Sequence, residues 1–160
     1  PDSYDIRSAE TAQRALDTYH DDIELLIFDR RLREMSGDEL AASIRAEHKK
    51  QLMLCVSGVK PGNDIHQLQC DEYIQKPFTE DELKTKVELL LNRTELEHPA
   101  REYLSLRSKQ VALNTAHGIS ATKMKGYQNC TEQIERVNIS TERRQTLERL
   151  LYSTPSNSTP

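Results

Sequence analysis

Two short runs of consecutive apolar residues stand out in the first half of the chain. They are Leu25–Phe28 and Leu52–Val56, and polar residues bound each of them. Continuous apolar runs of this length are typical of strands that are buried on both faces of a parallel sheet. Between them, residues 37–45 carry their apolar side chains at helical spacing, with Ser36 or Gly37 in position to cap the helix. The pattern predicts a strand, helix, strand unit.

The same alternation continues on both sides of this unit. A weaker strand is predicted at Asp5–Arg7, followed by a helix from Ala9 to Leu16. Beyond the second run we predict a helix that follows Gly62, a short strand at residues 71–75 and a capped helix that begins at Thr79. Alternating strands and helices of these lengths predict an α/β fold, in which helices cover both faces of a parallel sheet.

The pattern changes after Asn92, where long polar helices replace the alternation. One helix is predicted from Ala100 to His117, with Gly118 as its left-handed cap, and a second from near Ser120 with a break at residues 138–141. We therefore expect three parts, which are an α/β domain, an α-helical hairpin and a disordered tail with nothing to bury. Their ranges are residues 1–92, 93–152 and 153–160.

The distribution of charge differs between the two halves of the chain but does not alter the predicted fold. Residues 1–91 hold 12 Lys and Arg against 19 Asp and Glu, whereas residues 92–160 hold 10 against 7. Because the basic residues of the second half are interspersed along helices, they indicate a solvated surface and make nucleic acid an unlikely partner. No apolar stretch is long enough to span a bilayer and no signal peptide is recognisable, so a cytoplasmic location is expected. The scattered cysteines and histidines indicate no metal site.

Three polar residues follow directly on three predicted strands: Asp29, Ser57 and Lys76. The carboxyl ends of parallel strands lie at one edge of the sheet, where ligands bind in such folds. A carboxylate there can act as a nucleophile toward phosphorus, an ammonium can neutralise phosphoryl charge, and a hydroxyl can hydrogen-bond a phosphoryl oxygen. Each residue alone has an ordinary explanation as a turn or cap residue. Together they predict a phosphoryl-accepting site.

Three segments carry this pattern further. They are Leu26–Leu40, Val56–Gly58 and Tyr73–Phe78, and in order and spacing they resemble the receiver domain of two-component response regulators. The resemblance covers residues 1 to about 92 and implies a flavodoxin-like fold. It also implies a cis peptide before Pro77.

The resemblance implies a role for individual residues. Asp29 would be the phosphoacceptor, Ser57 the switch hydroxyl, Tyr73 the aromatic switch residue, and Lys76 the lysine that pairs with the acceptor. Mg²⁺ would be the cofactor, held by Asp29 and by the backbone carbonyl of Arg31. The chain would be no enzyme beyond self-catalysed phosphotransfer and dephosphorylation.

The second half has its own resemblance. Residues Arg101–Leu106, Ser108–Lys109 and Tyr127 are similar to the helical HalX domain that follows receivers in halophilic archaea. This similarity implies an archaeal response regulator whose helical part reads the state of the receiver.

The sequence also departs from the receiver pattern. Against that pattern, the chain is expected to lack the first strand and helix, and with them the acidic pair that holds the metal, so Mg²⁺ binding is expected to be impaired or lost. Asp21 and Asp22 are adjacent acids, but they precede the strand at residues 25–28 and are expected at the opposite end of the sheet. Arg33 stands where receivers usually have proline.

We therefore expect a response regulator of a two-component phosphorelay, a phosphoprotein that accepts a phosphoryl group on Asp29 from a sensor histidine kinase. It would act as a homodimer or on a downstream protein through the helical tail. One alternative is a degenerate pseudo-receiver that binds proteins without phosphorylation. Another is a transcriptional regulator with a DNA-binding tail, although no helix-turn-helix pattern follows Asn92.

Overall fold

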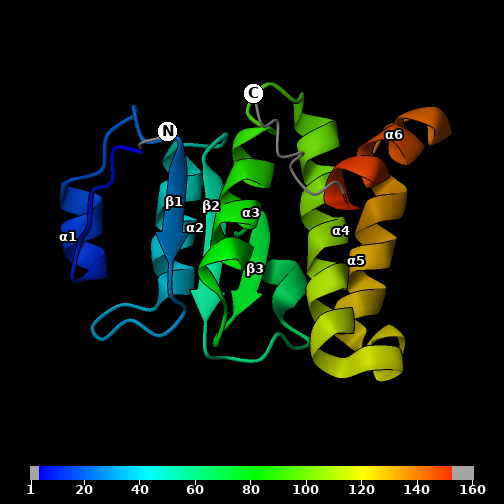
Figure 1. The fold of residues 1–160 in the computed structure, drawn as a ribbon, viewed down its shortest axis with the longest axis horizontal. Helices are drawn as coiled ribbons and strands as arrows, with labels where there is room; N and C mark the ends of the chain where they lie inside the picture. Colours follow the sequence, from blue (N-terminus) through cyan, green and yellow to red (C-terminus); the bar gives the residue numbers. More distant parts are fainter. Residues whose placement is uncertain (1–3, 153–160) are drawn as a thin grey trace.

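The computed structural model describes residues 4–152, and at its centre lies a parallel sheet. Its three strands are β1 (Leu25–Phe28), β2 (Leu52–Ser57) and β3 (Glu72–Gln75), in the order β1-β2-β3. β1 pairs with β2 from Leu25 opposite Leu52 onward. All three strands run in one direction and end at the same edge of the sheet (Figure 1). The predicted parallel α/β architecture is confirmed.

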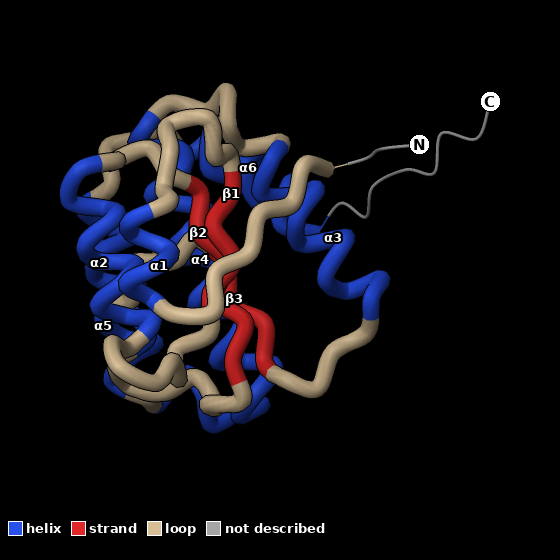
Figure 2. The backbone as a smooth tube through the Cα atoms, turned by 90° about the vertical axis from the view of Figure 1, so that its left-hand side faces the viewer, coloured by secondary structure: helices blue, strands red, loops and turns tan. Residues whose placement is uncertain are grey.

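Helices cover the two faces of the sheet unequally. Because side chains alternate along a strand, Met53 and Cys55 of β2 face one side and Leu54 and Val56 the other. The first side is covered by α2 (Gly37–Glu47) and the long α4 (His98–His117), and the second by α3 (Glu80–Leu91). Figure 2 shows these layers edge-on.

The helices that follow β1 and β3 begin at capping boxes. The hydroxyls of Ser36 and Thr79 accept from the backbone N–H three residues on, and Glu39 and Glu82 reach back to the capping residues. This reciprocal pairing satisfies N–H groups that have no partner within the helix. Of the two caps considered for α2, the structure selects Ser36.

The predicted strand at Asp5–Arg7 is wrong. These residues pair with no strand, and Ile6 is 82% exposed. A strand needs a neighbour to satisfy its backbone groups, and this segment instead contacts the rest of the described chain through the ion pair of Arg7 with Asp22. The helix predicted from Ala9 begins later, as α1 (Ala12–Asp17).

β1 is an edge strand and is less buried than its sequence indicates. One of its edges has no strand partner among residues 4–152, and Ile27 remains 46% exposed on the α3 side of the sheet. The expectation that this run is buried on both faces therefore holds for β2 but not for β1.

The helix predicted after Gly62 is also wrong, because the segment forms only the single 3₁₀ turn η1 (Ile65–Gln67). Its two apolar anchors, Ile65 and Leu68, are nevertheless buried. α4 and α5 (Lys125–Arg136) pack against this segment and bury it without a helix of its own.

The second half contains more than a hairpin. The 3₁₀ segment η2 (Gly118–Lys123) links α4 to α5, and a further helix, α6 (Thr141–Tyr152), follows the predicted break. Gly118 has the positive φ expected of a cap, but its ψ of −143° lies outside the left-handed helical region. The predicted tail at 153–160 lies outside the described residues.

The two halves of the chain share one apolar core. Ala100, Tyr103 and Leu104 of α4 belong to the same buried cluster as Met53 and Cys55 of β2. The carboxylate of Glu72 on β3, 1% exposed, accepts from Arg93 at 2.5 Å, from Lys86 at 2.7 Å and from the hydroxyl of Ser108 on α4. A buried ionic network therefore fixes α4 against β3.

None of the helices in the described part of the chain combines the length and apolar character that crossing a membrane requires.

Candidate functional site

Asp29, Ser57 and Lys76 come together at the carboxyl edge of the sheet. The hydroxyl of Ser57 donates to Oδ1 of Asp29 at 2.8 Å, and Nζ of Lys76 donates to Oδ2 at 2.7 Å. The backbone N–H of Arg31 donates a third hydrogen bond to Oδ1 at 3.0 Å. Both carboxylate oxygens are thus held by donors at the carboxyl ends of the three parallel strands, which lie side by side.

These donors set the ionisation of Asp29. Partial burial alone would raise the pKa of its carboxyl group, but the hydrogen bonds from Lys76, from the Arg31 backbone and from Ser57 outweigh that effect and hold the pKa below its usual range. Asp29 is therefore a carboxylate at neutral pH, which is the form that can act as a nucleophile.

Replacing Lys76 with methionine is expected to raise the pKa of Asp29, because an ammonium that donates to its carboxylate is lost while burial remains. The shift can be followed through the carboxyl carbon of Asp29 in an NMR titration. Lys84→Met is the matched control, since Lys84 pairs with Glu80 on α3. An Asp29 pKa that stays in place in Lys76→Met would show that the ion pair does not form in solution.

A chain of hydrogen bonds leads away from Asp29 through the loop after β2. The oxygen of Ser57 accepts from the backbone N–H of Val59 at 3.3 Å, and the carbonyl of Val59 accepts from the hydroxyl of Tyr73 at 2.5 Å. Burial raises the pKa of Tyr73 to about 12, so this hydroxyl keeps its proton and donates. The structure thus joins Tyr73 to Ser57 through the backbone of one residue.

Sequence reasoning missed Arg30, whose side chain lies mostly buried beside the acceptor. Its guanidinium donates to Asp38 at the start of α2, at 2.8 Å, and to Asp64 in the loop after β2, at 2.5 Å. Its place next to Asp29 was the only signal in the sequence, since nothing in the spacing marks Asp38 or Asp64 as its partners.

Gly37 also escaped the sequence reasoning as a site residue. A Cβ atom at this position would lie 1.9 Å from the carbonyl oxygen of Asp29 and 2.9 Å from the ring of Phe28. The N–H of Gly37 donates to the carbonyl of Arg30 at 3.0 Å. The first turn of α2 thus lies directly against the backbone that carries Asp29.

The remaining predicted residues lie as follows. Lys76–Pro77 is a cis peptide, as predicted. Arg33 is exposed in the loop after Asp29. Asp21 pairs with His48 and Asp22 with Arg7, at the amino end of β1, and neither contributes to the Asp29 cluster.

The carboxylates around Asp29 do not assemble into a metal-ligand set. Among residues 4–152, no group of three or more His, Cys, Asp or Glu side chains is arranged to hold a metal ion. Asp38 and Asp64 are already paired with Arg30, and both oxygens of Asp29 accept hydrogen bonds. The expected ligands were the carboxylate of Asp29 and the backbone carbonyl of Arg31. In the structure, the contact between these two residues is a hydrogen bond from the backbone N–H of Arg31 to Asp29.

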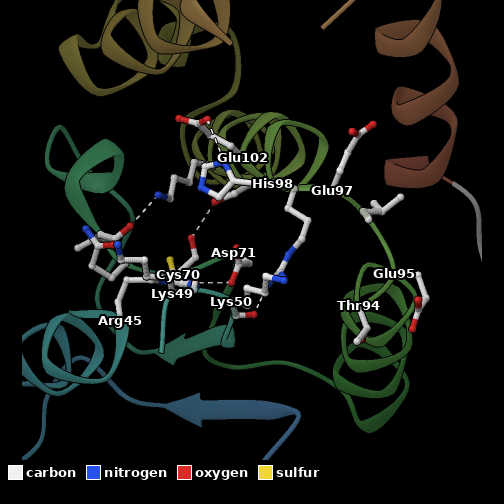
Figure 3. A pocket seen from close by; sticks show the side chains of 16 residues that line it. Arg45, Lys49, Lys50, Cys70, Asp71, Thr94, Glu95, Glu97, His98 and Glu102 are labelled. Carbon is white, nitrogen blue, oxygen red and sulfur yellow. Dashed lines mark hydrogen bonds and ion pairs between the residues drawn. The ribbon is translucent and has the colours of Figure 1, made fainter. Parts of the chain in front are cut away.

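A cavity of about 520 Å³ lies at the opposite end of the sheet, between α2 and the start of α4 (Figure 3). Three of the basic side chains that line it, those of Arg45, Arg101 and Lys109, donate hydrogen bonds to other parts of the fold. Arg45 pairs with Asp71 at 3.0 Å and donates to the carbonyl of Gln51, Arg101 donates to the carbonyl of Lys50, and Lys109 donates to that of Leu68. The contacts of Arg101 and Lys109 join the two halves of the chain, and none of the four involves Asp29, Ser57 or Lys76.

Comparison with known proteins finds a matching family model and several similar sequences. Residues 1–88 match the model of the response regulator receiver domain. A protein of Haloferax volcanii, provisionally named a transcriptional regulator, is 32% identical over 110 residues, which are 69% of this chain but 19% of that protein. A chemotaxis protein CheY homologue of Campylobacter jejuni is 34% identical over 94 residues, which are 54% of this chain and 72% of that protein.

A third relative also aligns with this chain over only part of its own length. The transcriptional regulatory protein SrrA of Staphylococcus aureus is 28% identical over 130 residues, 75% of this chain and 53% of that protein. No solved structure matches the chain.

Proposed function

Because the chain belongs to the family of response regulator receiver domains, we propose that it is the response regulator of a two-component phosphorelay and that Asp29 accepts the phosphoryl group. The observation that carries this proposal is the grip of Ser57 and Lys76 on the two oxygens of one ionised carboxylate. A hydroxyl and an ammonium in that position can transfer their hydrogen bonds to phosphoryl oxygens once the carboxylate is modified.

The donor in this proposal is the phosphohistidine of a sensor histidine kinase. A carboxylate oxygen of Asp29 forms a bond to phosphorus while the P–N bond breaks, and the electron pair of that bond leaves with the imidazole nitrogen. Lys76 stabilises the negative charge on the transferring group, and Ser57 donates to one of its oxygens. The chain itself supplies positioning and charge, as expected of a self-catalysed acceptor and not of an enzyme that turns over a substrate.

Mg²⁺ enters the proposal only as a weakly held ion. When bound in a phosphoryl-transfer site, such an ion neutralises charge on the phosphoryl oxygens. The described residues offer it the carboxylate of Asp29 and the carbonyl of Arg31, with no further carboxylate free nearby. We therefore propose that the binding of Mg²⁺ to these residues is impaired.

Incubation of the chain with acetyl phosphate and Mg²⁺ is expected to add the mass of one phosphoryl group, and Asp29→Asn is expected to abolish the gain. Intact-protein mass spectrometry measures both. Asp17→Asn is the matched control, because Asp17 is an exposed carboxylate at the end of α1. A wild-type chain that gains no mass, or a gain that persists in Asp29→Asn, would contradict the proposal.

One observation favours a second candidate, a pseudo-receiver that binds a protein partner without being phosphorylated. The described carboxylates assemble no metal-ligand set around Asp29. The same mass experiment separates the two candidates, since only the first predicts an Asp29-dependent gain. A cytoplasmic location, and a helical part of HalX type that passes the signal to a second copy or a downstream protein, complete the leading proposal.

A further inference from the structure

A buried cation, Lys109 of α4, lines the cavity of about 520 Å³ between α2 and the start of α4. Lys109 is only 5% exposed. Its ammonium group donates to the carbonyl of Leu68 at 2.6 Å, and no carboxylate in the described part of the chain forms an ion pair with it. Because an ammonium group has three N–H donors, two of them have no partner among residues 4–152.

The groups around Lys109 do not balance its charge. The thiols of Cys70 and Cys130 lie close enough to interact with it, but burial raises their pKa values to about 12 and about 11, so both stay neutral. Lysine is rarely buried without a partner, because removing an ammonium group from water is costly. An anion held in the cavity would offset this cost.

A second cation of α4, Arg101, lines the same cavity and also lacks a counter-charge. Its side chain donates one hydrogen bond, to the carbonyl of Lys50, and forms no ion pair with any residue that the structure describes. Burial lowers the pKa of Arg101, Asp71 partly offsets this effect, and the charges of Arg45 and Arg93 add to it. The remaining N–H groups of its guanidinium are therefore available to an anion.

Two further cations stand at the rim of the cavity. Lys49 and Lys50 follow α2, are exposed, and form no ion pair within residues 4–152. Together with the two cations of α4 they form one side of the cavity, here called the cationic wall, which consists of Lys49, Lys50, Arg101 and Lys109.

The acidic residues of the cavity do not neutralise the cationic wall. Asp71 is buried and pairs with Arg45, so its charge is already used within the fold. The other acids that line the cavity are all exposed, and they are Glu95, Glu97 and Glu102. Figure 3 shows Glu95 and Glu97 on the side of the cavity away from Lys49 and Lys50. The cationic wall therefore remains open to an anion that enters from solvent.

We propose that this cavity binds the phosphate group of a small anion on the cationic wall. Ammonium and guanidinium groups are the donors that phosphate oxygens accept from most strongly in proteins. The cavity is much larger than a phosphate ion and has the size of a small-molecule site, which favours a phosphorylated metabolite over free phosphate. Leu68, Cys70 and Leu96 supply apolar surface for the organic part of such a ligand.

The test uses AMP, inorganic phosphate and adenosine as probes, and amide chemical shifts in NMR as the readout. AMP at millimolar concentration is expected to cause saturable shifts in residues 49–50, 68–71 and 98–109, whereas adenosine, which lacks the phosphate, is expected to cause none. Tighter binding of AMP than of phosphate would identify a phosphorylated metabolite as the ligand, and equal binding would identify free phosphate. Without saturable shifts from either anion, the proposal is overturned.

Two variants test the cationic wall. Lys109→Met is expected to weaken AMP binding about tenfold or more, because a buried donor with a full charge is lost. Lys49→Gln/Lys50→Gln changes exposed residues that do not affect folding, and it is expected to weaken binding about two- to fivefold. Lys125→Met is the matched control, since Lys125 is exposed at the start of α5, outside the cavity. Wild-type affinity in both variants would refute the site.

The Asp29 cluster also contains a cation able to bind phosphate, so Lys76→Met is measured as well. AMP is expected to bind this variant as it binds the wild-type chain. If binding is lost in Lys76→Met and kept in Lys109→Met, the anion occupies the Asp29 cluster and the proposal is overturned. AMP binding is measured without a phosphoryl donor, so a chain that takes up no phosphoryl group on Asp29 contradicts the proposed function and leaves this test intact.

Discussion

Gly37→Ala is expected to destabilise the chain by about 1–3 kcal/mol, the usual cost of forcing extra atoms into a packed site. The added methyl group would lie 1.9 Å from the carbonyl oxygen of Asp29, and backbone cannot yield as a flexible side chain can. Either α2 or the residues that follow β1 must shift. The free energy of unfolding, measured by chemical denaturation, gives the cost of that shift.

The same substitution is expected to affect the chemistry. Asp29 would move relative to Ser57 and Lys76, so its pKa should rise toward the usual value and its phosphorylation by acetyl phosphate should slow. Gly58→Ala is the matched control, since a Cβ atom there meets nothing within 4 Å and the residue adjoins Ser57. The close approach of α2 to β1 would be refuted by a Gly37→Ala chain as stable as the control.

Glu72→Gln is expected to lower the free energy of unfolding by about 3–5 kcal/mol, because it leaves the guanidinium of Arg93 buried without its counter-charge. This would be a large share of the roughly 5–15 kcal/mol that stabilises a typical domain. Glu80→Gln is the control, since Glu80 is an exposed residue that pairs with Lys84. Equal stability of the two variants would show that the buried network contributes little.

The network also predicts a pH dependence. Burial alone would raise the pKa of Glu72, but Arg93 and Lys86 outweigh it and lower the pKa below the usual value of about 4.3. A carboxyl group whose pKa is lower in the folded state stabilises the fold fully above its unfolded pKa, and this stabilisation is lost as the pH falls through the folded value. Denaturation curves should therefore lose stability below about pH 4.3 in the wild-type chain, and less steeply in Glu72→Gln.

The meeting of Asp29, Ser57 and Lys76 could be predicted from the sequence because it depends on very little. Two apolar runs and the short segment at residues 71–75 mark the strands, parallel strands end at one edge, and the residue after each predicted strand must then lie at that edge. The caps at Ser36 and Thr79 could be read for a similar reason, since they depend on residues three positions apart.

Contacts between segments that are distant along the chain could not be predicted from the sequence. The segment after Gly62 has the apolar spacing of a helix, yet α4 and α5 bury Ile65 and Leu68 from outside and leave only one 3₁₀ turn. The burial of Ser108 and Lys109 in α4 could not be predicted from the sequence either. Their partners, Glu72 and the carbonyl of Leu68, lie 36 and 41 residues away along the chain. Polar residues on a helix are ordinarily assigned to its solvent side.

The apolar cluster that runs from β2 into α4 has a consequence for how any signal can travel. Two parts that hold a common interior cannot swing about a hinge as separate bodies, since parting them would uncover Met53, Cys55 and Leu104 together. A change of state in this chain must instead be a small rearrangement inside a single cooperative unit, with most of the interior unaltered while a few surface contacts exchange partners.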